Sequence, residues 1–348
     1  MSAKTNICVL GAGSWGTALA ILLASNHHAV TLWSRREDHC QNLILKRENE
    51  DYLPGIKLPK DLTITSDIEK AVSGKKILIF VVPSHGVRAM SEKIKPYINE
   101  SMLILNAAKG LEADTLKTMR QVIAEVLFQG EDKQLATLSG PNHAEEVGKS
   151  IPSATVVASK NRKIAEELQR ILINARFRVY TNPDVIGVEM GGALKNVMAL
   201  GSGISDGLGF GDNTKAAFMT RGLYEISRLG IAMGARPMTF SGLSGIGDLI
   251  VTCTSEHSRN RRAGKLIGQG KTIDDITSET KMVIEGVKTT QAAKQLAEKY
   301  NTEMPITEEI YQVLFKKKPP LEGVENLMER VRTNEMEEVV DEKMWEDA

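Results

Sequence analysis

The sequence predicts an α/β protein in two parts, a doubly wound and mostly parallel β-sheet followed by an all-α half. Three observations support this. Short β-branched runs alternate with helical patterns through the first half of the chain. Several runs are apolar on both faces, as expected of strands that helices cover on both sides. After about Asn182 the β-rich runs stop, and Met, Leu and Ala recur at helical spacing.

Seven apolar runs in the first half are predicted to be strands. They cover residues 7–10, 29–33, 77–82, 102–107, 135–140, 154–159 and 178–182. Because the strand-like runs end there, we place the boundary between the halves near residue 185. The predicted domains are residues 1–185 with the sheet, residues 186–335 with the helices, and residues 336–348 as an acidic tail.

Composition excludes several classes of protein. The chain has 348 residues, 42% of them hydrophobic, and its 44 Lys and Arg balance its 44 Asp and Glu. A balanced charge offers no general attraction to nucleic acid or to an anionic membrane. No secretory segment precedes the first apolar run, and the longest apolar run is too short to span a bilayer. The three cysteines lack metal-type spacing, so we expect a reduced, cytoplasmic protein without a bound metal.

A glycine loop follows the first predicted strand. Gly11 permits a tight turn, Gly13 lets a pyrophosphate approach the backbone, and Gly16 lets the next helix lie close to the strand. Ser14 and Trp15 stand where that helix begins, and its first N–H groups favour phosphate. The position between a strand and a helix predicts a dinucleotide site in a Rossmann-type domain rather than a plain turn.

The end of the second predicted strand indicates which dinucleotide binds. An NAD-selective site usually places an acid there for the ribose 2′-hydroxyl, but this strand ends in Ser34, Arg35 and Arg36. Guanidinium groups match the geometry of a 2′-phosphate. We therefore expect NADP to be favoured, with NAD left open. The stretch 264–272 resembles a phosphate loop, but its glycine spacing is wrong, so we predict a helix end and a turn.

Two segments of the first half place polar groups beside the predicted crevice. Lys109 follows the strand at 102–107, and ligands of open α/β sheets bind at such strand ends. Gly140 and Asn142 belong to a second strand-to-helix turn, where backbone N–H groups are free and the amide can donate or accept. His143 follows them, and the sequence assigns it no role.

The helical half carries the strongest candidates for chemistry. Lys195 and Asn196 lie in a helix of small apolar residues, and burial lowers the pKa of a lysine towards neutrality. Asp248 follows three glycines in a tight segment and could hold Lys195 in place together with Asn196. The run Ser258, Arg259 and Asn260 could clamp a substrate phosphate, since a guanidinium can bond it through two N–H groups.

Taken together, the motifs resemble NAD(P)-dependent glycerol-3-phosphate dehydrogenase of the bacterial type, from about residue 6 to about residue 330. They are GAGSWGTALA, NAAKGLE, SGPNHAEEV, ALKNVMALGSGISDGLGFGDNTKAA, RGLYEISRLG, GLSGIGDLIVTCTSEHSRNRR and VIEGVKTT. The resemblance implies a Rossmann domain and an all-α domain like the C-terminal domain of 6-phosphogluconate dehydrogenase. Asn142 and His143 depart from the Ser or Thr and the Phe that bacterial members usually carry.

The resemblance also implies an activity, the interconversion of dihydroxyacetone phosphate and sn-glycerol 3-phosphate, which in bacteria supplies phospholipid synthesis. Lys195 resembles the catalytic proton donor and acceptor. The residues that resemble substrate contacts are Lys109, Gly140, Asn142, Asp248, Ser258, Arg259 and Asn260. Those that resemble cofactor contacts are Ser14, Trp15, Arg35, Lys109, Ala144, Arg259, Val283 and Glu285, to which the strand-end argument adds Arg36. A homodimer through the helical domain is likewise implied.

Two other interpretations stay open at the level of sequence. Other two-domain NAD(P)-dependent hydroxyacid dehydrogenases also pair a glycine loop with a helical-domain lysine. In those families the lysine resembles the first residue of a Lys-x-x-x-Asn pattern, whereas here Asn196 directly follows Lys195. A dinucleotide-sensing protein without turnover would keep the glycine loop. It would not need Lys195, Asp248 and Arg259 together.

Overall fold

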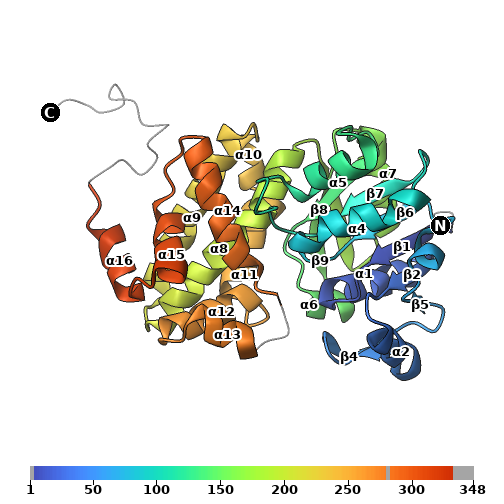
Figure 1. Cartoon of the computed structure of the whole chain (residues 1–348), viewed down its shortest axis with the longest axis horizontal. Coiled ribbons are helices and arrows are strands. Elements are labelled where there is room, and N and C mark those ends of the chain that lie inside the picture. Colours follow the sequence, from blue (N-terminus) through green and yellow to red (C-terminus); the bar gives the residue numbers. More distant parts are fainter. Residues whose placement is uncertain (1–3, 280–282, 332–348) are drawn as a thin grey trace.

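The structure is a computed structural model that describes residues 4–279 and 283–331. A sheet-containing half precedes a helical half along the chain, and Figure 1 shows the two halves side by side. This arrangement confirms the predicted fold class, an N-terminal Rossmann-like domain followed by a helical domain. The predicted acidic tail at 336–348 lies outside the described residues.

The main sheet has eight strands in the order β10-β9-β8-β7-β6-β1-β2-β5, and the pairs are parallel except β8 with β9. A separate antiparallel pair joins β3 to β4. The strands are β1 (Asn6–Leu10), β2 (Ala29–Trp33), β3 (Glu48–Asn49), β4 (Leu53–Lys57), β5 (Thr63–Thr65), β6 (Ile77–Phe80), β7 (Leu103–Asn106), β8 (Leu135–Ser139), β9 (Ser153–Ala158) and β10 (Phe177–Asn182).

The seven predicted strands are all present, with ends that differ by no more than two residues. The prediction missed β3, β4 and β5. Two of these are only two and three residues long, and β4 contains a Pro-Gly pair that argues against a strand. The segment 264–272 is the end of a helix and a turn, as predicted.

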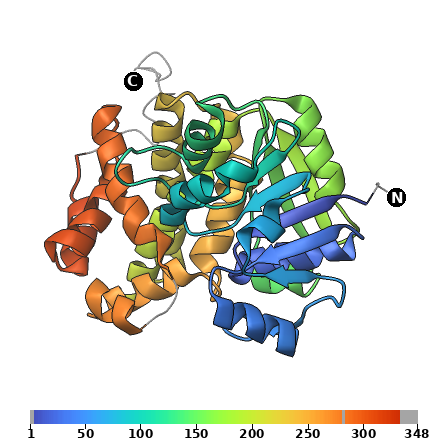
Figure 2. The ribbon, with the colours of Figure 1, turned by 45° about the vertical axis from the view of Figure 1, so that its right-hand side comes forward.

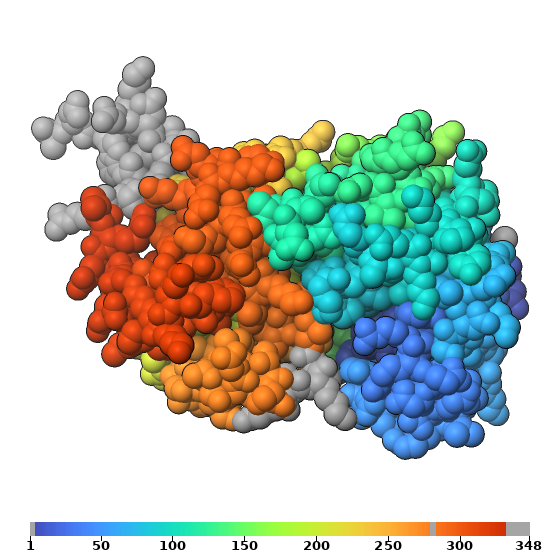
Figure 3. Space-filling model, viewed as in Figure 1, coloured from blue at the N-terminus to red at the C-terminus, as the bar shows by residue number. Residues whose placement is uncertain are grey.

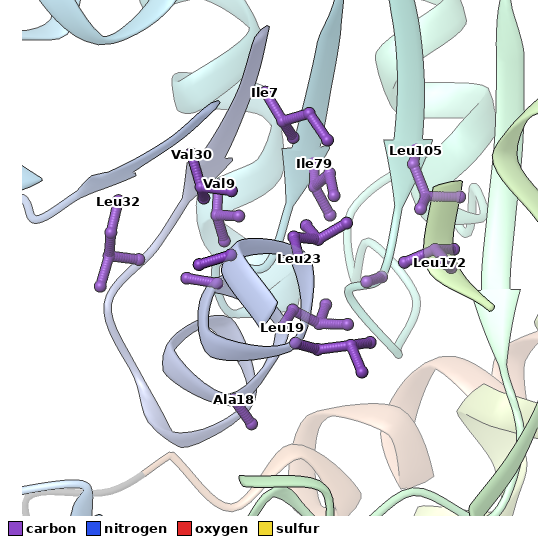
Figure 4. Packing of buried hydrophobic residues seen from close by; sticks show 14 of the residues in the cluster. Ile7, Val9, Ala18, Leu19, Leu23, Val30, Leu32, Ile79, Leu105 and Leu172 are labelled. Atoms are coloured by element: carbon purple, nitrogen blue, oxygen red, sulfur yellow. The ribbon is translucent and has the colours of Figure 1, made fainter. Parts of the chain in front are cut away.

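Side chains of successive strand residues alternate between two buried layers. Val9, Ile79 and other inward residues of one face pack on the helices α1 and α7, and Figure 4 shows Leu19 and Leu23 of α1 beneath the strands. Leu10 and other residues of the opposite face pack on α3, α4 and α5. The helices of this half are α1 (Ser14–Ser25), α2 (Glu37–Lys46), α3 (Ile68–Val72), α4 (Val87–Ile94), α5 (Met119–Phe128), α6 (Ala144–Gly148) and α7 (Arg162–Leu172).

The strand order reverses between β1 and β6. The chain proceeds from β1 to β2 on one side and then crosses to β6 on the other side of β1. Loops that leave the two strands at this point diverge and open a crevice, which is where ligands of such sheets bind. In Figure 2, β1 runs from the N-terminus towards the helical half, so the crevice faces that half.

The helical half is built around α8, whose side chains are buried along most of its length. α12 crosses it very closely, as two glycines at the crossing show. A Cβ at Gly203 would lie 2.1 Å from the Arg261 carbonyl, and one at Gly264 would lie 2.0 Å from the Leu200 carbonyl. The helices are α8 (Val185–Gly207), α9 (Asp212–Ala232), α10 (Pro237–Phe240), α11 (Asp248–Thr254), α12 (Arg259–Gly268), α13 (Ile273–Glu279), α14 (Glu285–Lys299), α15 (Pro305–Lys316) and α16 (Pro320–Met328).

Among residues 4–279 and 283–331, no helix combines the length and the apolar character needed to span a bilayer.

Candidate functional site

A cavity of about 610 Å³ opens between the two halves. The halves meet along the middle of the molecule in the space-filling view (Figure 3). The volume suits a small ligand with a cofactor. Most of the predicted site residues line it: Gly11, Gly13, Ser14, Trp15, Arg35, Arg36, Lys109, Asn142, Ala144, Lys195, Asp248, Ser258, Arg259, Asn260, Val283 and Glu285. Two other predicted site residues, Gly16 and Gly140, are not among its lining residues.

The glycine loop has the geometry of a phosphate cradle. Gly11 has a φ of +123°, and a Cβ there would lie 2.8 Å from the Val81 carbonyl oxygen. A Cβ on Gly16 would lie 1.8 Å from the Gly11 oxygen, which explains the close contact of α1 with the loop. A Cβ on Gly13 would meet nothing within 4 Å, so this glycine borders open space. The loop and the free N–H groups that begin α1 therefore fit the pyrophosphate of a dinucleotide.

Three charged side chains meet at the wall of the cavity, and they come from α8, from α11 and from the loop after β7. Lys195 on α8 is 7% exposed, and its Nζ donates to Asp248 Oδ1 and, at 2.9 Å, to Thr252 Oγ1. Asp248 opens α11 and is 0% exposed. Its Oδ2 accepts from Lys109 Nζ at 2.7 Å, and the same Nζ donates to the Gly140 carbonyl at 3.1 Å. One buried carboxylate thus holds two ammonium groups.

The electrostatics of this cluster favour proton transfer near neutrality. Burial, together with repulsion from Lys109, lowers the pKa of Lys195 to about 7, although Asp248 opposes the shift. Burial alone would raise the pKa of Asp248, but the two neighbouring ammonium groups outweigh it and hold that pKa below its usual value. The carboxylate therefore stays ionised while Lys195 can gain or lose a proton.

The predicted phosphate clamp lies at the start of α12. Ser258 caps the helix by accepting from the Arg261 N–H at 3.3 Å, and the Arg259 side chain that follows it is exposed to the cavity. Asn260 donates to Asn196 Oδ1 at 2.9 Å and accepts from the Gly286 N–H at 2.9 Å. Asn196 therefore orients Asn260 and not Lys195, which corrects the expectation that it would hold the lysine.

Asn142 and His143 line the same cavity from the turn after β8. Both N–H bonds of the Asn142 amide are used, by the carbonyls of Pro141 and Ala154 at 3.0 and 2.9 Å. Its buried Oδ1 makes no hydrogen bond within the described residues, so this side chain can only accept from a ligand. Burial and the nearby Lys195 lower the pKa of His143, whose ring centroid lies 5.9 Å from that of His257.

The rim of the cavity joins the two halves. Glu285, the first residue of α14, accepts from the Ser84 N–H at 3.1 Å and from Ser84 Oγ at 2.6 Å. Arg35 and Arg36 are exposed at the end of β2, and Arg36 lies 3.9 Å from Asp38 and 3.7 Å from Asp51. Such exposed ion pairs are weak, so Arg36 can turn to a ligand.

Sequence reasoning missed several residues of this cavity. The missed lining residues include Ser34, His39, Tyr52, His85 and His257. Ser84 and His85 follow β6, so their position after a strand next to the crevice was a usable signal. His39 and Tyr52 gave no such signal, because both lie in polar stretches that a sequence presents as surface. Among residues 4–279 and 283–331, no group of three or more His, Cys, Asp or Glu side chains is placed to hold a metal ion.

Family models match both halves of the chain. The model of the NAD-dependent glycerol-3-phosphate dehydrogenase N-terminus matches residues 6–165, and that of the C-terminus matches residues 184–325. The glycerol-3-phosphate dehydrogenase (NAD(P)+) of Pelotomaculum thermopropionicum is 55% identical over 339 residues, 97% of this chain and 97% of that protein. The protein of the same name from Moorella thermoacetica is 53% identical over 334 residues, 96% of this chain and 98% of that protein.

Solved structures agree with these matches. The crystal structure of glycerol-3-phosphate dehydrogenase from Coxiella burnetii superimposes with a TM-score of 0.90 at 38% identity, over 94% of this chain and 99% of that one. The Saccharomyces cerevisiae enzyme gives a TM-score of 0.80 at 28% identity, over 94% of this chain and 100% of that one.

Proposed function

Since the chain belongs to the NAD(P)-dependent glycerol-3-phosphate dehydrogenase family, we propose that it reduces dihydroxyacetone phosphate to sn-glycerol 3-phosphate, with Lys195 as the proton donor. The observation that carries the proposal is the meeting of Lys195, Asp248 and Lys109 in the cavity that the glycine loop also lines. A site that only senses a dinucleotide has no need of a buried lysine poised to titrate.

Each group of the cluster has a separate role in this reaction. The reduced nicotinamide, when bound, supplies the hydride to C2 of the substrate. Lys195, as ammonium, stabilises the negative charge that grows on the C2 oxygen and delivers the proton to it. Asp248 and Thr252 fix the position of Lys195 Nζ. Lys109 keeps Asp248 ionised and adds a second positive charge beside the reacting carbonyl.

The start of α12 binds the substrate phosphate in this proposal. Arg259 provides a guanidinium, and the Ser258 hydroxyl and the Asn260 amide add neutral donors. The acceptor Asn142 Oδ1 receives a hydroxyl of the substrate, and Gly140 contributes through the carbonyl that orients Lys109. Binding energy from the phosphate then aligns the carbonyl with the hydride.

Most of the residues that would hold the cofactor lie on the sheet side of the cavity. Gly11, Gly13 and Gly16 would shape the pyrophosphate loop, and Ser14 and Trp15 would hold the phosphates at the start of α1. Arg35 and Arg36 receive the 2′-phosphate, so NADPH is favoured over NADH. The remaining cofactor contacts in the proposal are Lys109, Ala144, Arg259, Val283 and Glu285.

The wider proposal concerns the context of the enzyme. The product supplies phospholipid synthesis. The enzyme acts in the cytoplasm, and the three free cysteine thiols support this reducing location. The protein acts as a homodimer through its helical domain, without nucleic acid or integral membrane association. Residues 1–185 form the cofactor domain and residues 186–335 the substrate and dimerisation domain.

The test of the proposal is the loss of reduced-nicotinamide absorbance when purified protein meets dihydroxyacetone phosphate, run in parallel with NADPH and NADH. We expect rapid loss of absorbance, with sn-glycerol 3-phosphate as the product. At low cofactor concentrations the loss should be faster with NADPH than with NADH. Measurable NADPH binding without turnover of dihydroxyacetone phosphate would overturn the roles given to Lys195 and Arg259.

A further inference from the structure

The loop that carries Lys109 joins the end of β7 to the start of α5, and its two arms pair with each other. Leu111 and Thr118 form an antiparallel bridge. Next to the bridge, the Glu112 N–H donates to the Lys117 carbonyl at 2.9 Å. The far end of the loop is thus tied to a residue only two positions from Lys109. A group that fixes Thr118 therefore also fixes the backbone beside this lysine.

Glu189 of α8 holds the far end of the loop. This side chain is 8% exposed, and it reaches the start of α5 from the helical half. Its Oε2 accepts from Thr118 Oγ1 at 2.7 Å, and its Oε1 accepts from the Arg120 N–H at 2.9 Å. A carboxylate suits this position, because the first N–H groups of a helix lack partners within it. Since Lys195 also belongs to α8, one helix supplies both the reactive lysine and the anchor of the loop.

The loop is packed closely on α8 between these two residues. A Cβ at Gly192 would lie 3.8 Å from Lys109 Cδ and 2.6 Å from Ser139 Oγ, so a larger residue there would push on both. Leu111 is 3% exposed and belongs to the hydrophobic core of the helical half. The loop is therefore part of the sheet half by chain order but is positioned by the helical half.

The contacts of Lys109 require this support. Its Nζ donates to Asp248 Oδ2 at 2.7 Å and to the Gly140 carbonyl at 3.1 Å. A lysine side chain loses much rotamer freedom when its end is held, so its backbone must be fixed for these bonds to persist. A displacement of about 1 Å would take both bonds beyond hydrogen-bond distance. Misplacement of this size at a reacting centre can cost about 100-fold in rate.

We propose that Glu189 is a positioning residue for the reaction, because it holds Thr118 and the start of α5 on α8 and so keeps Lys109 on Asp248. The inference rests on the proposed function, in which Lys109 adds a positive charge beside the reacting carbonyl. Glu189 is not among the residues that line the large cavity. It therefore acts through Lys109 and not by contact with the ligands.

The experiment compares Glu189→Ala with a matched control, Glu225→Ala. Glu225 on α9 is 3% exposed and holds the start of α15 in the same way, since it accepts from the N–H groups of Ile306 and Thr307 and from the Thr307 hydroxyl. It also stands outside the cavity lining. Both variants remove a buried carboxylate from the start of a helix, so both should lower the melting temperature. Only Glu189→Ala should change catalysis.

The first measurement is kcat for dihydroxyacetone phosphate at saturating NADPH, at a temperature where each variant is folded. We expect kcat to fall at least about ten-fold in Glu189→Ala and less than about two-fold in Glu225→Ala. Glu189→Gln is the conservative variant, whose amide can accept from the Arg120 N–H and donate to Thr118 Oγ1. Its kcat should stay within about three-fold of the wild type.

The second measurement tests whether Glu189 acts through Lys109. In a Lys109→Met background, adding Glu189→Ala should lower kcat by less than about two-fold, because the group that it positions is already gone. A readout without turnover is the labelling of lysines by acetic anhydride, followed by mass spectrometry. Lys109 should react at least about three-fold faster in Glu189→Ala than in the wild type or Glu225→Ala, since loss of the carboxylate partner exposes its amine and favours the neutral form.

Four outcomes overturn the inference: an equal loss of kcat in Glu225→Ala, a loss in Glu189→Gln as large as in Glu189→Ala, additive losses with Lys109→Met, or unchanged labelling of Lys109. If Glu189→Ala does not fold, Thr118→Val replaces it, since it keeps the shape of the side chain but removes the hydroxyl that Glu189 binds. It should show the same loss, and an unchanged kcat overturns the inference. A wild type that does not reduce dihydroxyacetone phosphate would refute the proposed function, whereas the labelling of Lys109 decides the inference in either case.

Discussion

Replacing Asp248 by Asn tests the electrostatic core of the mechanism. The change keeps the shape of the side chain but removes the carboxylate that two lysines share. A unit charge about 4 Å away contributes about 4 kcal/mol at an effective dielectric constant near 20. That energy corresponds to roughly 3 pKa units. The pKa of Lys195, about 7 in the native protein, would fall accordingly.

The expected consequence is a large loss of turnover at neutral pH. About half of the Lys195 side chains are protonated at pH 7 in the wild type, since the pKa is about 7. A fall of about 3 pKa units leaves roughly one in a thousand protonated, so reduction of dihydroxyacetone phosphate should slow about 500-fold at that pH. The assay is the pH profile of kcat at saturating NADPH, in which activity should recover towards acid pH.

The matched control is Asp206→Asn. Asp206 also joins two cations, since it lies 2.7 Å from Lys215 Nζ and 2.7 Å from Arg261 Nε, but it stands outside the cavity lining. Both variants should lose stability, by about 3–5 kcal/mol for the fully buried Asp248 and less for Asp206. Only Asp248→Asn should change the pH profile. A profile like the wild type, with turnover at pH 7 reduced less than about three-fold, would refute the electrostatic reasoning.

Three further predictions follow from single contacts. Gly13→Ala should fold normally but bind NADPH at least about ten-fold more weakly. Gly16→Ala should also lower the melting temperature, because its Cβ would meet the Gly11 carbonyl at 1.8 Å. Equal melting temperatures of the two variants would contradict this. Arg35→Ala should raise the KM for NADPH about 10- to 100-fold with little change for NADH, and a parallel rise for both would argue against 2′-phosphate binding. The pKa of Lys195 is about 7 in the folded protein, below its value in the unfolded chain. Above pH 7 the unfolded chain therefore binds more protons than the folded protein, so the free energy of unfolding should rise with pH. Urea unfolding between about pH 7 and pH 9 should show that rise, up to about 1.4 kcal/mol per pH unit, relative to Lys195→Met, and identical slopes would contradict it.

Local sequence signals were sufficient for seven of the eight strands of the main sheet and for the glycine loop. The strands are apolar runs bounded by turns, and the glycine loop is a contiguous motif whose backbone geometry follows from its residues. Lys195 could be singled out because a lysine among small apolar residues conflicts with its surroundings. Burial of that lysine follows from α8, which is packed on nearly every side.

The rest depends on contacts between distant parts of the chain. The bond between Lys109 and Asp248 spans 139 residues, and that between Ser84 and Glu285 spans 201. Nothing local tells Asn196 to pair with Asn260 instead of its neighbour Lys195. His39 belongs to a helix with mostly exposed polar side chains, and the short strand β3, which buries its partner Asn49, gives too weak a pattern to be predicted.

The most direct test of the central claim, that Lys195 carries the proton, is a comparison of turnover and cofactor binding in Lys195→Met. The account predicts that kcat for dihydroxyacetone phosphate falls by about 10²- to 10⁴-fold, while the Kd for NADPH changes by less than about three-fold. The exposed Lys133→Met variant should match the wild type in both measurements. Near-normal turnover in Lys195→Met, with the protein folded and NADPH bound, would contradict the account.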